Sequence, residues 1–338
     1  MTAPSVVIMR LDPGSTTAAA ANALRSGALV ARVPAGVIDL SGPGAVACMQ
    51  GLLTNDLEKP GDGAFVYGAL LTPKGMIVTD GWVTRLGETV RIVVPPAGRE
   101  RAVRIFSRSI PPRLARSLDR TAELTVLRLA GAHSLALAEA ARLSTPPAPG
   151  RVIATPDGDV ARIPEALAPP FVLQIVTETV RADALVARLG AAGVVIAEPA
   201  ALELARVLAG WPALGSEIDE KTIPQEVRFD EVGGVSYTKG CYTGQETVSR
   251  LHFRGHTNRR LQGVVFDAAP AREDPLPVFR EDQEVGRVTS IVWVPDAGRW
   301  LGLALVRREV EPGTLVRAGE VEARVVSPPL ALLRHDPA

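Results

Sequence analysis

The spacing of apolar residues changes near Gly255, and this change restricts the folds that the chain can adopt. Before it, runs with the period of helices mix with strand-like runs. After it, short apolar runs separated by Gly, Pro and Asp remain, which is typical of a small antiparallel barrel. A length of 338 residues suggests two or three packed units. We therefore predict an α+β protein with two mixed α/β units over about 1–120 and 121–255 (together 1–255) and a C-terminal antiparallel β-barrel domain over 256–338.

Individual elements follow from local spacing and from turn residues. A β-hairpin is predicted over 65–72 and 76–86, because Pro73-Lys74-Gly75 supplies a fixed φ followed by a glycine. The predicted helices cover 18–30 with Ser15 and Thr16 as caps, 43–53, 99–110, 132–143, 181–189, 200–208 and 244–251. The other predicted strands cover 36–40, 89–94, 124–129, 152–163, 171–176, 194–196, 261–266, 284–294, 301–307 and 321–326.

Charge and composition argue against several classes of protein. The formal net charge is zero and no block of like charge occurs, so we expect no nucleic-acid partner and no polybasic membrane surface. No apolar run approaches the ~20 residues of a membrane helix, and no secretory signal is apparent.

Cys48 and Cys241 lie far apart, so no disulfide framework follows, and we expect a cytoplasmic protein. His252 and His256 lack an obvious third ligand, so we expect no metal site.

The segment from Lys239 to Glu246 carries the strongest chemical signal. Thr243 and Glu246 have the spacing of a capping box, which predicts a helix that starts at Thr243. Cys241 then lies just before the positive end of the helix dipole, and Lys239 stands two residues earlier. Both positive charges favour the thiolate form of Cys241 over the thiol.

A structural role is the competing interpretation of each cysteine. A free cysteine is commonly a small buried residue, and we interpret Cys48, which lies among apolar helix residues, in this way. Around Cys241, Gly240 and Gly244 leave space for a ligand or for another backbone segment. From these residues alone, a functional thiolate and a packing residue both remain open for Cys241.

A resemblance to a known family rests on eight contiguous residues, Lys239-Gly240-Cys241-Tyr242-Thr243-Gly244-Gln245-Glu246, followed by Arg250. This run resembles the fingerprint of YgfZ-type folate-binding proteins in the glycine-cleavage T-protein (aminomethyltransferase) superfamily. It is also similar to the related mitochondrial iron–sulfur assembly factors. Supporting matches extend through most of the chain: Leu53-Thr54-Asn55-Asp56, Tyr67, Leu71-Thr72-Pro73-Lys74-Gly75, Arg206, Ile223-Pro224-Gln225-Glu226, Gly286-Arg287-Val288-Thr289-Ser290 and Leu301-Gly302-Leu303-Ala304.

The resemblance implies tetrahydrofolate, or another reduced folate, in a central cavity bordered by the three units. The residues that it suggests as folate contacts are Tyr67, Asp80, Arg206, Glu226 and Tyr242. It further implies an accessory protein for the assembly or repair of iron–sulfur clusters, with a link to tRNA modification and with iron–sulfur client or assembly proteins as partners.

Within this resemblance, the fingerprint residues take different roles. Cys241 is expected to be the reactive or cluster-contacting thiolate, and Lys239 its electrostatic support. Gln245 and Arg250 are expected to organise the segment or to contact a partner.

The sequence departs from the T-protein pattern at three positions where that pattern has polar groups. A pair of aspartates is replaced by Thr79-Asp80, an asparagine by Pro95 and a glutamate by Leu208. These changes argue against aminomethyl transfer, because a carboxylate and an amide are natural partners for the donor-rich edge of a pterin. A T-protein-like aminomethyltransferase or other one-carbon transferase remains the alternative. A folate-binding scaffold in which Cys241 is structural is a third reading.

Overall fold

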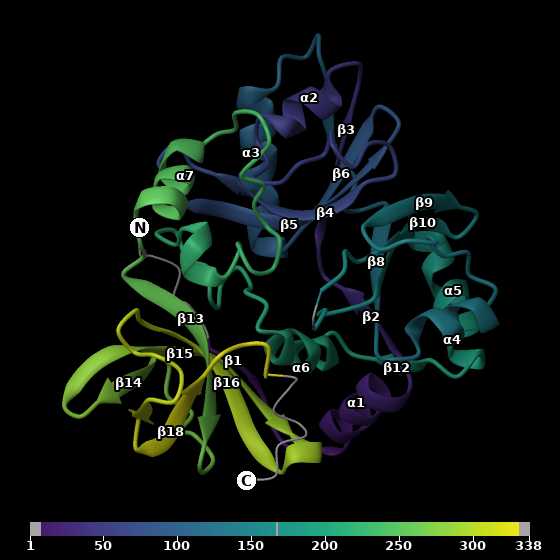
Figure 1. Ribbon diagram of the computed structural model, residues 1–338. Coiled ribbons are helices and arrows are strands. Elements are labelled where there is room, and N and C mark those ends of the chain that lie inside the picture. The colour runs from purple at the N-terminus through teal and green to yellow at the C-terminus, as the bar shows by residue number, and fades with distance from the viewer. Residues whose placement is uncertain (1–7, 167, 331–338) are drawn as a thin grey trace.

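Three sheets of five, six and seven strands organise the protein. The structure is a computed structural model that describes residues 8–166 and 168–330. The three sheets belong to three units that surround a common centre, with the barrel at the lower left of Figure 1 and the two mixed units above it and to its right. The predicted α+β architecture with a terminal barrel is therefore confirmed.

The first unit is a five-stranded antiparallel sheet with the order β4-β5-β6-β3-β7. The predicted hairpin and the helix near residue 100 are confirmed, but the helix near residue 45 is shorter than predicted. It ends early because Leu53 bridges to Leu70 and the amide of Thr54 donates to the carbonyl of Ala69. The elements are β3 (Gly36–Ser41), α2 (Ala45–Gln50), β4 (Phe65–Leu71), β5 (Ile77–Leu86), β6 (Thr89–Val94), α3 (Arg99–Ser109) and β7 (Arg116–Asp119).

The second unit is a six-stranded sheet with the order β12-β2-β8-β11-β10-β9. Its strands are β2 (Leu29–Val33), β8 (Leu124–Ala130), β9 (Arg151–Thr155), β10 (Gly158–Arg162), β11 (Leu173–Glu178) and β12 (Val195–Ala197). Its helices are α1 (Ser15–Ser26), α4 (Ser134–Ala140), α5 (Thr179–Ala191) and α6 (Ala200–Ala209).

Two sequence predictions in the second unit are wrong. The first helix does not reach Val30, because Gly27 follows its last residue and the chain then enters β2; its N-cap is Gly14, and Ser15 is already helical. The predicted strand over 152–163 is a hairpin instead, because Gly158 takes a positive φ of 118° next to the turn between β9 and β10.

The third unit is a closed barrel of six antiparallel strands, because β15 also pairs with β16. A short strand from the start of the chain, β1 (Met9–Leu11), extends it by pairing in parallel with β15. Two of the six strands, β14 and β17, were not predicted; both are short, and a proline interrupts the first. The strands are β13 (Arg259–Phe266), β14 (Leu276–Arg280), β15 (Gln283–Val294), β16 (Arg299–Arg307), β17 (Leu315–Ala318) and β18 (Val321–Val326).

The units do not follow one another strictly along the chain. The first strands of the chain, β1 and β2, join the barrel sheet and the six-stranded sheet, so the N-terminal segment ties those two units together. A segment after α6 then passes through the centre and ends in α7 (Gln245–Arg254), which leads into the barrel. One apolar core contains residues from all three units and from this central segment.

Candidate functional site

Aromatic side chains gather where the three units meet. The chain has seven Phe, four Trp and three Tyr, and six of them form this cluster. Tyr67 on β4 is the cross-strand partner of Trp82 on β5, and their ring centroids lie 5.0 Å apart. Trp211 from the central segment lies 5.1 Å from Tyr67 and 5.7 Å from Trp82. The remaining members, which pack against these three rings, are Phe65, Phe171 and Phe229.

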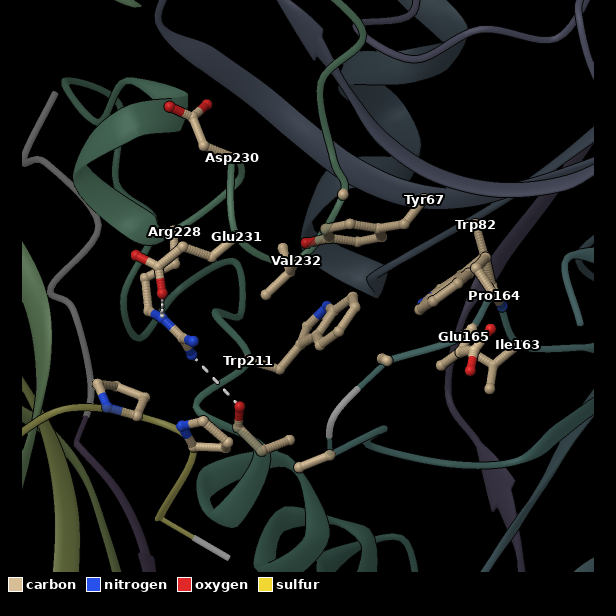
Figure 2. A pocket seen from close by; sticks show the side chains of 16 residues that line it. Tyr67, Trp82, Ile163, Pro164, Glu165, Trp211, Arg228, Asp230, Glu231 and Val232 are labelled. Atoms are coloured by element: carbon tan, nitrogen blue, oxygen red, sulfur yellow. Dashed lines mark hydrogen bonds and ion pairs between the residues drawn. The ribbon is translucent and has the colours of Figure 1, made fainter. Parts of the chain in front are cut away.

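Two adjoining cavities open around this cluster, and both are lined by Tyr67, Trp82 and Trp211. The larger has a volume of about 410 Å³ and is bordered by the central segment, by residues before β11 and by the chain after β18. Figure 2 shows the three rings beside it, with Arg228 and Glu231 as an ion pair on the wall formed by the central segment. The smaller has a volume of about 190 Å³ and contains the polar groups that follow.

Asp80 places a carboxylate in the smaller cavity. It lies two residues before Trp82 on β5, so both side chains point from the same face of the sheet. The hydroxyl of Tyr67 donates to Oδ2 at 2.9 Å, whereas Oδ1 is buried without a hydrogen-bond partner among the described residues. Burial raises the pKa of Asp80 to about 6, although the bond from Tyr67 opposes this shift. An acceptor oxygen is therefore available to a ligand.

Arg128 places donor groups in the second unit's part of the site, and Gln174 holds them in position. They are cross-strand partners on β8 and β11, and the Arg128 Nε and Nη2 atoms donate to Gln174 Oε1 at 3.1 and 3.0 Å. The guanidinium lies 4.5 Å from the ring centroid of Phe171. Burial lowers the pKa of Arg128 to about 10, and the nearby charge of Asp80 limits this shift. Arg128 therefore stays charged at neutral pH.

The site fits a reduced folate. A pterin presents ring N–H and amino donors along one edge, and Asp80 Oδ1 is an unsatisfied buried acceptor. Flat aromatic walls formed by Tyr67, Trp82 and Trp211 suit a planar heterocycle and an aryl group. The larger cavity adjoins this position and offers room for the rest of such a ligand. The residues present thus match the chemistry of the pterin.

Arg206, Glu226 and Tyr242 are placed differently from Tyr67 and Asp80. The Arg206 side chain borders the smaller cavity, but Glu203, Glu217, the Trp211 carbonyl and Ser290 accept its hydrogen bonds. Its guanidinium therefore ties α6 to the central segment and to β15. The other two residues line neither of the two cavities: Glu226 pairs with Arg259 at 2.9 Å, and the Tyr242 ring lies 5.1 Å from Lys239 Nζ.

Lys239 anchors the fingerprint segment to the first unit. Its ammonium donates to the carbonyls of Gln50, Leu53 and Asn55 at 2.6, 2.7 and 2.9 Å. These carbonyls lie at and just after the C-terminal end of α2, where a cation is favourable. Burial lowers the pKa of Lys239 to about 8. Its three hydrogen bonds go to main-chain oxygens and give Lys239 a structural role. Electrostatic support of Cys241 by Lys239 stays a prediction.

Cys241 lies on the surface, in a loop held from both sides. The amide of Thr243 donates to the carbonyl of Gly51 at 3.0 Å. Gly244 has a φ of 82° and packs so closely on the β4–β5 turn that a Cβ there would lie 2.6 Å from the Thr72 carbonyl. The predicted capping box is wrong, because Gly244 is the N-cap of α7 and Thr243 makes no side-chain cap bond. The helix still begins just after the thiol, with Gln245 as its first residue.

The remaining fingerprint residue and the two histidines lie on or near α7. Arg250 is exposed on that helix. His252 stacks on Tyr237 with centroids 3.6 Å apart, and both His252 and His256 border a third cavity of about 330 Å³ next to the barrel. Among residues 8–166 and 168–330, no three potential metal-binding side chains cluster together. In the same part of the chain, no helix has the length and apolar character needed to cross a membrane.

Sequence reasoning missed five residues of the site: Trp82, Arg128, Phe171, Gln174 and Trp211. Trp82 had a usable signal, because it follows Asp80 by two residues in a predicted strand and therefore shares its face. The other four come from segments whose approach depends on how the units pack.

Comparisons with known proteins agree with this architecture. A model of the GCVT N-terminal domain matches residues 15–149, and a model of the glycine cleavage T-protein C-terminal barrel domain matches residues 259–331. The crystal structure of glycine cleavage system aminomethyltransferase T from Bartonella henselae shares the fold, with a TM-score of 0.79 and 20% identity over 95% of this chain and 91% of that one.

The sequence relatives have one of two names, aminomethyltransferase or tRNA-modifying protein YgfZ. An aminomethyltransferase from Rubrobacter xylanophilus is 30% identical over 334 residues, which cover 90% of this chain and 86% of the relative. The tRNA-modifying protein YgfZ of Cronobacter sakazakii is 32% identical over 116 residues, or 33% of this chain and 35% of the relative. YgfZ of Vibrio vulnificus is 33% identical over 155 residues, or 44% and 47%. The match thus spans less than half of these YgfZ proteins. Together with the two domain matches and the shared fold, these relatives show that the chain is a YgfZ-type member of the glycine-cleavage T-protein superfamily.

Proposed function

We propose that this protein binds tetrahydrofolate in its central cavity and acts as a cytoplasmic accessory factor for the assembly or repair of iron–sulfur clusters. Cys241 is its reactive or cluster-contacting thiol. The observation that carries the proposal is the position of Cys241, which is exposed, lines neither of the two central cavities and sits in a loop anchored by Lys239. A partner protein can therefore reach the thiol while the folate is held inside.

Folate binding is supported by the polar and aromatic groups of the centre. Asp80 Oδ1 accepts from the donor edge of the pterin, and Tyr67 fixes the carboxylate through Oδ2. The rings of Trp82 and Trp211 flank the space beside them. Each of these groups is present before the ligand arrives, so little side-chain ordering is required on binding.

Aminomethyl transfer is less well supported by the residues in place. Thr79 is buried and its hydroxyl donates to the main-chain carbonyl of Asp80. Pro95 borders the smaller cavity without a donor, and Leu208 belongs to the apolar core. At the smaller cavity the described residues place the carboxylates of Asp80 and Glu203, and Glu203 already accepts from Arg206, so Asp80 alone keeps an unpaired buried oxygen there.

Complementation of a deletion strain tests the accessory role. Wild type, Cys241→Ala and the control Cys48→Ala are expressed at equal levels, and the activities of several iron–sulfur enzymes are measured under oxidative stress. Because relatives bear the name tRNA-modifying protein, modified tRNA nucleosides form a second readout. We expect Cys48→Ala to restore both and Cys241→Ala to restore neither. Full restoration by Cys241→Ala would remove the thiol from the proposal.

The second candidate function is aminomethyl transfer, favoured by the long match to the Rubrobacter xylanophilus aminomethyltransferase. An assay with aminomethylated carrier protein and tetrahydrofolate decides between the two functions. We expect no turnover above the uncatalysed rate. Robust turnover that depends on Asp80 would establish the transferase instead.

A further inference from the structure

Arg128 is a partly buried cation at the wall of the smaller cavity. No carboxylate of the described residues forms an ion pair with it, although the charges of Asp80 and Glu203 lie near it. Its Nε and Nη2 atoms share one acceptor, the neutral amide oxygen of Gln174, and Nη1 has no hydrogen-bond partner in the described part of the chain. The side chain borders the smaller cavity, where a ligand can enter. Buried charges in proteins are normally paired.

Three arginines with little exposure, Arg91, Arg206 and Arg228, each pair with a carboxylate. Arg91 donates to Asp39 at 2.6 Å, Arg206 to Glu217 at 2.9 Å and Arg228 to Glu231 at 2.8 Å. Arg128 is also held in place, but the groups that hold it, the amide of Gln174 and the ring of Phe171, are neutral. The fold therefore fixes the direction of its guanidinium while leaving the Nη1 nitrogen unused among the described residues.

The same cavity contains the complementary group. Asp80 borders it, and its Oδ1 atom is a buried acceptor without a partner among the described residues. The hydrogen bonds of Arg128 to the described residues use Nε and Nη2, which leaves Nη1 free to donate. A free anion would pair with Arg128 but would be repelled by Asp80. A neutral edge that carries donors beside an acceptor satisfies both residues.

We propose that Arg128 is a specificity-determining residue that donates to the 4-oxo oxygen of a pterin while Asp80 accepts from its N3–H and 2-amino groups. This inference rests on the proposed binding of folate and assigns the recognition of the pterin's 4-oxo group to Arg128. A neutral 4-amino pterin presents a donor at that position, which would face the Arg128 donor and leave it unpaired. It also has no hydrogen on N3, so Asp80 would lose one of its two donors.

Calorimetric titration with tetrahydrofolate and with its 4-amino-4-deoxy analogue measures this preference. At pH 8 the analogue's ring is unprotonated and Asp80, with a pKa of about 6, is charged. We expect wild type to bind the 4-oxo compound at least roughly tenfold more tightly, because the bond involves a charged donor. In Arg128→Met the ratio of the two dissociation constants should fall well below the wild-type ratio, and the preference that remains should come from the N3–H bond to Asp80. The control Arg113→Met, an exposed residue, should keep the wild-type ratio.

The ratio separates specificity from folding, because a merely structural change weakens both ligands alike. If Arg128→Met does not fold, Arg128→Gln replaces it, since a terminal amide can present either its oxygen or its NH₂ group to position 4. A ratio that stays at the wild-type value in these variants, or a wild type without preference, would overturn the inference and leave folate binding intact. A wild type that binds neither compound would overturn the folate proposal together with it.

Discussion

The hydroxyl of Tyr67 donates to Asp80 Oδ2 at 2.9 Å across strands β4 and β5, and Asp80 Oδ1 is buried without a partner in the described structure. One carboxylate thus has one oxygen fixed by the protein and one available. Because Asp80 is only 6% exposed, its charge state follows its surroundings more than the solvent. The Tyr67–Asp80 pair therefore affects both the stability of the folded protein and its binding of a ligand.

The pH dependence of folate binding should follow Asp80. Burial raises its pKa to about 6, and only the carboxylate can accept two pterin donors. The affinity for tetrahydrofolate should therefore fall about tenfold per pH unit below 6 and stay constant from pH 7 to 8. Arg128, with a pKa of about 10, keeps its charge throughout. Calorimetry between pH 5 and 8 measures this profile, and Asp80→Asn should flatten it; an unchanged profile in that variant would exclude Asp80 as the titrating contact.

The same carboxyl should destabilise the ligand-free protein at neutral pH. Its folded pKa of about 6 lies above the ordinary value of 3.8, so its contribution to stability is present below about pH 4 and is lost as the pH rises through 6. Asp80→Asn should therefore raise the free energy of unfolding by about 1–3 kcal/mol at pH 8. Urea denaturation at pH 4 and pH 8 tests the sign, because the gain should be confined to the higher pH. An equal gain at both values would point to packing instead of charge.

Lys239 should act as a structural anchor of the fingerprint segment. Lys239→Met leaves three carbonyls without their donor, at Gln50, Leu53 and Asn55. We expect the free energy of unfolding to fall by about 2–3 kcal/mol. The exposed Lys59 supplies the matched control, since Lys59→Met should change stability by less than about 0.5 kcal/mol. Denaturant unfolding of the two variants gives the comparison, and equal stabilities would show that the three bonds contribute nothing measurable.

Thiol labelling should separate the two cysteines of the chain. Cys241 is exposed, whereas Cys48 is half-buried and burial raises the pKa of its thiol. Iodoacetamide at pH 7.5 should therefore modify the native protein in a fast phase at Cys241 and a slow phase at Cys48. Cys241→Ser should remove the fast phase, and Cys48→Ser should retain it. Mass spectrometry of the labelled peptides identifies each phase; labelling of Cys48 first would contradict the accessibility seen in the structure.

Local signals in the sequence determined the fold class and part of the site. The β4–β5 hairpin follows from its proline–glycine turn, and it alone brings Tyr67 and Asp80 together. The barrel follows from short strands without helical spacing, and the fingerprint marks the loop that exposes Cys241. These features depend on residues within one or two turns or strands of each other, so spacing and turn chemistry suffice to predict them.

Tertiary structure alone decided how distant segments complete that site. Lys239 bonds to carbonyls that lie 184 to 189 positions earlier in the chain, a structural role that its place beside Cys241 in the sequence did not indicate. Arg128 meets Gln174 across 46 positions, and Trp211 reaches Tyr67 from the central segment. Such contacts are set by how the three units pack, and an unpartnered donor or acceptor can be recognised only when all of its neighbours are in place. For this reason the fingerprint could be read from the sequence, whereas the unpaired groups of Asp80 and Arg128 could not.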